Sequence, residues 1–192
     1  KGFRDQRRVR AAVKLARAYV DADKPALALP LAESAVRHLR GQYVRGKDRV
    51  EAHYVLAEAL FQLGKHGPAQ KDFAVVESLV SRTCDWSAVG DFSRMYECGG
   101  DAIIMQKTLE RLVELDKPTT REQKLAWVSR VYLLAGIDRW APPPVAELTR
   151  LESAVALDEE LRGKGDIATQ TGLVRLGQAY LDRDRPRDAY AL

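Results

Sequence analysis

Apolar residues recur every three or four positions along most of this 192-residue chain, with polar residues between them. This spacing is typical of amphipathic helices, and no stretch alternates as a strand would. Pro30 lies inside the second predicted helix, so that helix either begins later than residue 25 or bends there. The pattern predicts ten helices, at residues 5–22, 25–40, 48–63, 67–82, 86–98, 100–116, 120–135, 143–161, 166–183 and 186–192.

The first helix of each predicted pair repeats one motif: a small residue, with a bulky residue just before it and another three positions later. Small residues let two antiparallel helices approach closely, so we expect them where helices cross. On the same reasoning, a larger side chain at Ala57 or Gly177 would overpack the crossing. The small residues of the five copies are Ala16, Ala57, Ser93, Ser129 and Gly177.

This motif resembles the tetratricopeptide repeat (TPR), which spaces a large residue, Gly or Ala, and Tyr along one helix, then Ala and Phe along the next. The clearest copy runs from Leu173 to Tyr180 and continues to Pro186 and Ala189. The resemblance implies an all-α, right-handed α-solenoid of about five helix-turn-helix units, with longer links than usual. The units are expected at residues 5–40, 48–82, 86–116, 120–161 and 166–192, as one array over 1–192.

The last unit stops inside its second helix, whereas terminal units of a solenoid normally present a polar face. We therefore expect either a fragment of a longer protein or self-association through the last helix.

In TPR proteins the first helix of each unit lines the concave face, which is where a partner is expected to bind. Arg17, Arg94 and Arg130 between apolar neighbours would suit an extended or helical peptide that carries carboxylates. Alternatively, the apolar neighbours are core, and the arginines pair with Glu58, Glu97 or Asp91. The residues expected to contact the partner are Val13, Arg17, Val20, Tyr54, Glu58, Phe61, Arg94, Arg130, Leu133, Gln178 and Leu181.

The expected function is that of a protein–protein interaction scaffold. A regulatory or oligomerisation module of a multidomain signalling protein is the alternative. Residues 1–49 hold thirteen Lys or Arg against five Asp or Glu, so binding of nucleic acid by the basic first helix is a further, less favoured hypothesis. The chain has no asparagine, which disfavours the chaperone-binding branch of the family, where paired Lys and Asn grip a C-terminal carboxylate.

No motif predicts an enzyme, a cofactor or a metal site. The three histidines fall in different elements, and His53 is expected to be an interior polar residue that needs partners. The run at residues 158–160 is interpreted as solvent-facing charge at a helix end. Trp127 and Trp140 could mark either a binding surface or packing between units.

The two cysteines, Cys84 and Cys98, would lie roughly 20 Å apart on one helix, too far for a disulfide. Free thiols are typical of a reducing compartment. The sequence shows no signal peptide and no apolar run long enough to cross a membrane. A cytoplasmic location is therefore expected.

Overall fold

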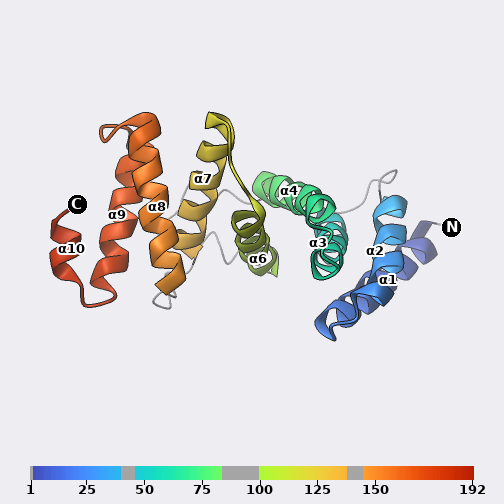
Figure 1. Cartoon of the computed structure of the whole chain (residues 1–192). Helices are drawn as coiled ribbons and strands as arrows, with labels where there is room; N and C mark the ends of the chain where they lie inside the picture. Colours follow the sequence, from blue (N-terminus) through green and yellow to red (C-terminus); the bar gives the residue numbers. More distant parts are fainter. Residues whose placement is uncertain (1, 40–45, 84–99, 138–144) are drawn as a thin grey trace. The chain divides into compact units, whose positions relative to one another are not determined.

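The computed structural model describes residues 2–39, 46–83, 100–137 and 145–192. Every regular element in these ranges is an α-helix, which confirms the all-α prediction (Figure 1). The helix predicted at 86–98, both cysteines, Trp86 and Trp140 lie outside the described residues. The helices are α1 (Gly2–Asp21), α2 (Pro25–Leu39), α3 (Gly46–Gln62), α4 (His66–Thr83), α6 (Gly100–Leu115), α7 (Arg121–Ile137), α8 (Val145–Arg162), α9 (Ile167–Leu181) and α10 (Pro186–Tyr190).

These helices form two compact units, residues 1–115 and 116–192. In the first unit α2 packs against α1 and α3, and α4 packs against α3 and α6. In the second, α8 packs against α7 and α9, and α10 packs on α9 (Figure 1). Packing mainly between near neighbours in sequence is the arrangement of an α-solenoid. Whether residues 1–192 form one continuous right-handed array stays a prediction.

Three helices end in the same turn, and each is the first of a predicted pair: α1, α3 and α9. A residue with left-handed backbone closes each one: Asp23 (φ 55°), Gly64 (φ 72°) or Asp184 (φ 54°). Its N–H bonds to the carbonyl three residues earlier, and the next N–H bonds to the carbonyl five residues earlier, at 2.8–3.1 Å. This pair of bonds is the Schellman motif. Each left-handed residue follows the small residue of the predicted motif by seven positions, which supports the register of these three repeats.

The second helix, α2, begins at Pro25 as predicted and includes Pro30, so the alternative of a later start is excluded. Pro25 stands at the first helical position, where its missing N–H costs nothing. Pro30 is exposed, on the side of α2 away from the core. The buried side of α2 consists of Ala28, Ala32 and Ala35 together with Val36 and Leu39. The three small side chains let the neighbouring helices pack closely against α2.

In the first unit, the small residues of the motif lie at helix contacts, as predicted. Ala16 of α1 and Ala57 of α3 are completely buried. Around them α4 contributes Phe73, Val76 and Val80, whose side chains have no exposed surface. The apolar core therefore lies on the inner faces of α1–α4 and α6.

In the second unit, the small residues of the motif do not lie at tight crossings, and the expectation for Ser129 and Gly177 is wrong. Ser129 is exposed, and its hydroxyl donates to the Leu125 carbonyl at 2.9 Å. A Cβ at Gly177 would meet only Leu192, at 3.6 Å. The close approach is instead at Gly172 of α9, where a Cβ would lie 2.8 Å from Tyr132 Cε1 and closer still to the Tyr132 hydroxyl.

Candidate binding surfaces

A chain of aromatic and charged side chains joins α1, α3 and α6 in the first unit. The Arg17 guanidinium lies 5.1 Å from the centre of the Tyr54 ring, and the Tyr54 hydroxyl donates to Glu58 at 3.4 Å. Arg111 of α6 donates to the same Glu58 carboxylate at 3.3 Å and stacks 4.1 Å from the Phe61 ring. Cation–π contacts and a shared carboxylate thus tie three helices together.

Burial governs the electrostatics of this cluster. The Glu58 side chain is only 7% exposed, so its charge needs the Arg111 partner. Burial, aided by the Glu58 charge, raises the pKa of the Tyr54 phenol. Burial alone lowers the pKa of the Arg111 guanidinium, but Glu58 and Glu114 outweigh it and the net shift is upward. The surroundings therefore further stabilise the neutral form of Tyr54 and the charged form of Arg111.

The expected contact residues of the first unit divide into two groups. Val13, Val20, Tyr54 and Glu58 are buried between helices, as in the alternative interpretation of the sequence. Arg17 and Phe61 keep part of their side chains exposed, and Arg17 pairs with Asp21 at 3.8 Å instead of with Glu58. Arg94 and its neighbours Asp91 and Glu97 lie outside the described residues. The partner of Glu58 is Arg111, which the sequence pattern did not single out.

The outer face of α9 carries the most exposed apolar line in the second unit. Ile167, Val174 and Leu181 are 84%, 71% and 49% exposed. They follow one another at seven-residue intervals, which places them on one side of the helix over four turns. Gln178 is exposed on the same side, and its amide donates to Asp182 at 2.7 Å. We call Ile167, Val174, Gln178 and Leu181 the α9 stripe.

Arg175 lies at the edge of the α9 stripe. It is half-buried, and it donates to the backbone carbonyl of Tyr132 on α7. It forms no ion pair within the described part of the chain. Burial lowers the pKa of its guanidinium.

The α7 candidates are less accessible than those on α9. Arg130 forms an ion pair with Asp116, and only 17% and 12% of the two side chains are exposed. Leu133 is half-buried, and so is Trp127. Exchanging Arg130 for Glu would set two carboxylates against each other, so this change tests the stability of the unit more than partner binding.

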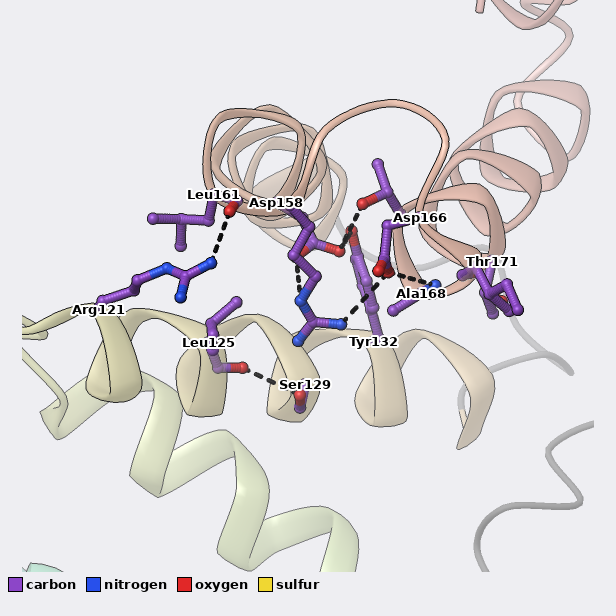
Figure 2. A network of polar contacts seen from close by, with 12 residues as sticks. Arg121, Leu125, Ser129, Tyr132, Asp158, Leu161, Asp166, Ala168 and Thr171 are labelled. Atoms are coloured by element: carbon purple, nitrogen blue, oxygen red, sulfur yellow. Dashed lines mark hydrogen bonds and ion pairs between the residues drawn. The ribbon is translucent and has the colours of Figure 1, made fainter.

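A second polar cluster in this unit centres on Asp158, which is completely buried. In Figure 2 the Tyr132 side chain of α7 points to this carboxylate. Tyr132 and Thr169 both donate to Asp158 Oδ2 at 3.2 Å. Arg162 Nε lies 3.2 Å from Oδ1, as an ion pair without hydrogen-bond alignment. The expectation that residue 158 is solvent-facing is wrong.

The spacing of α8 contained a signal for this burial. Leu148, Leu151 and Val155 are buried at intervals of three and four, and the next step along the same line is residue 158. A carboxylate that continues an apolar line needs hydrogen-bond donors from neighbouring helices. Those donors come from α7 and α9, so this cluster fixes three helices to one another and does not face a partner.

Other predicted polar residues lie as follows. His53 is buried, and its Nδ1 lies 2.8 Å from Asp72 Oδ1 on α4, which confirms the expectation of an interior histidine with a partner. Arg10 makes a bidentate contact with Asp48 at 2.8–3.1 Å, so part of the basic charge on α1 is paired. Arg8 and Lys14 are exposed on the same helix.

In the part of the chain that the structure describes, every helix is too short or too polar to span a lipid bilayer. Within the same residues, no three His, Cys, Asp or Glu side chains are grouped so that they could hold a metal ion.

No protein-family model and no curated protein matches this chain. Among solved structures, two crystal structures from Podosopora anserina, one of them of a point variant, are similar at 19% identity. They cover 96% of this chain and 90% of theirs, with TM-scores of 0.42 and 0.41. MamA (41-end) from Desulfovibrio magneticus RS-1 is similar at 18% identity over the same shares, with a TM-score of 0.34. The Podosopora structures are described as kinesin light chain TPR-like repeats, the repeat that the sequence motif resembles.

Proposed function

We propose that this protein is a helical-repeat scaffold that binds a protein partner, and that the α9 stripe receives a helix or an extended peptide of that partner. The exposed line of Ile167, Val174 and Leu181 carries the proposal. Isolated apolar residues are ordinary on a protein surface, but an aligned series is typical of an interface.

Burying these three side chains against a partner lowers the free energy of the complex. Burying an exposed aliphatic side chain contributes about 1.5–3 kcal/mol when the burial is complete. Three such side chains on one helix face can therefore stabilise a complex by several kcal/mol, before the entropy cost of association. An amphipathic helix matches the geometry, since its own apolar residues recur at the same seven-residue interval.

The contact set expected from sequence agrees with this surface in part. Gln178 and Leu181 belong to the α9 stripe, and both are exposed. We propose no catalytic role, because the polar clusters around Glu58 and Asp158 join helices of the same unit.

A photo-crosslinking amino acid at position 174 tests the proposal in cells. The matched control carries the same amino acid at Ala156, which is exposed on the neighbouring helix α8. We expect a protein adduct from position 174 that disappears when Leu181→Asp is added, and no such adduct from position 156. Equal adducts from both positions, or an adduct unaffected by Leu181→Asp, would refute the proposal.

A further inference from the structure

Two opposite charges border the α9 stripe. Arg175 and Asp182 each follow a stripe residue, Val174 and Leu181, by one position. They are therefore seven residues apart on the same edge of the stripe, about 10 Å along the helix. A helix that packs on the stripe would bring its own edge residues to these two charges.

We infer that the partner segment is an amphipathic helix with an acidic residue opposite Arg175 and a basic residue, seven positions away in its own sequence, opposite Asp182. This inference rests on the proposed function and specifies which helices the stripe accepts. The order of the two charges in the partner sets the direction in which its helix runs along α9.

The Arg175 guanidinium has N–H groups that can donate hydrogen bonds to a partner. Its guanidinium carries five N–H groups in a planar fork, and the described residues provide one acceptor, the Tyr132 carbonyl. A half-buried cation without a carboxylate is costly, and an incoming carboxylate would offset that cost with charge-assisted hydrogen bonds. An acidic residue of the partner therefore contributes more binding free energy opposite Arg175 than it would opposite a fully exposed arginine.

Asp182 offers the complementary contact. It is exposed, and its carboxylate accepts one hydrogen bond, from Gln178 Nε2 at 2.7 Å. A carboxylate has about four acceptor sites, so it can also receive a lysine or arginine from the partner.

The same charges disfavour a second copy of this chain as the occupant. If two copies of α9 run antiparallel with Ile167 opposite Leu181, the same edges of the two helices face each other, and Arg175 meets the second copy's Arg175. Like charges opposite each other weaken this arrangement, whereas a partner with complementary charges meets no such penalty.

Four synthetic helical peptides of three heptads test the inference on the whole chain. All carry the same apolar residues at seven-residue intervals. Their two edge positions are Glu then Lys, Lys then Glu, Lys and Lys, or Glu and Glu. Fluorescence anisotropy measures each Kd at low salt for the wild-type protein, Arg175→Glu and Val174→Asp.

For the wild-type protein, we expect the two mixed-charge peptides to bind about tenfold more tightly than the Lys–Lys and Glu–Glu peptides, since one close charge pair contributes a factor of this size. The Arg175→Glu protein should then prefer the Lys–Lys peptide. Equal Kd values for all four peptides on the wild-type protein would overturn the inference, whatever the stability of the variants.

The Val174→Asp protein separates this inference from the proposed function. Loss of all peptide binding with Val174→Asp, together with equal Kd values for mixed-charge and like-charge peptides on the wild-type protein, would keep the stripe as a binding surface and refute the inferred charges of the partner. Undiminished peptide binding to the Val174→Asp protein would refute the α9 stripe as the binding surface, and with it the proposed function. A dimer in sedimentation experiments that Val174→Asp dissociates would assign the stripe to a second copy and also overturn the inference.

Discussion

Replacing Gly172 with alanine should destabilise the second unit, whereas the same change at Gly177 should not. A Cβ at 172 would overlap the Tyr132 ring and hydroxyl, while one at 177 would make an ordinary contact with Leu192. Both glycines lie in α9, so alanine gains the same helix propensity, about 1 kcal/mol, at either position. The two variants therefore differ only in what the new methyl group meets.

The cost at Gly172 has two parts. Overpacking a filled site costs about 1–3 kcal/mol. Moving the Tyr132 hydroxyl also removes a donor from the buried Asp158 carboxylate, which costs about 1–3 kcal/mol more. Gly172→Ala should therefore be less stable than Gly177→Ala by about 2–6 kcal/mol.

Urea unfolding followed by circular dichroism measures this difference. The unfolding midpoint of Gly172→Ala should fall well below that of Gly177→Ala, which should equal or exceed the wild-type midpoint. Equal midpoints for the two variants would refute the packing of α9 against α7 at Gly172. In a Tyr132→Ala background the same glycine change should cost less, because that variant lacks both the ring and the hydroxyl that the methyl group would overlap.

Three further predictions concern local features. Gly64→Ala should destabilise the first unit by about 1 kcal/mol, because the backbone at this position is left-handed. Gly67→Ala is the control and should be neutral, because its φ is not positive and the new methyl group would meet open space. Equal thermal midpoints for the two variants would contradict this prediction. Asp158→Ala should cost about 2–4 kcal/mol and Glu160→Ala less than about 0.5, as urea midpoints would show; similar values would place residue 158 at the surface. Because burial raises the pKa of Tyr54 above its ordinary value of 10.0, the unfolded chain loses this proton first as pH rises, and stability that is present below pH 10 should decline above it. Tyr54→Phe should reduce the decline between pH 8 and pH 11, and an unchanged decline would argue against the buried phenol.

The helices and turns of this chain could be predicted because their signals are local. Pro25 marks the start of α2, and Gly64 marks the turn after α3, since each residue type suits a particular backbone conformation. The Ala16 and Ala57 crossings also followed from spacing, because neighbouring repeats in the first unit pack in the expected register.

The contacts of the second unit could not be predicted in the same way. Periodicity shows which side of α9 is apolar, but which residue meets Tyr132 depends on the angle and height at which α7 crosses it. The tight contact lies at Gly172 and not at Gly177. The partners of Asp158 come from three helices, and no local pattern in the sequence brings them together. The exposure of the α9 stripe likewise depends on which neighbours cover that helix.

Hydroxyl-radical footprinting of the protein, free and bound to the partner crosslinked at position 174, tests the role of the α9 stripe most directly. Mass spectrometry reports the oxidation of Ile167, Val174 and Leu181, which are exposed in the structure. All three should react readily in the free protein and become protected together in the complex. Unchanged reactivity of the three side chains in the complex would contradict the assignment of α9 as the binding helix.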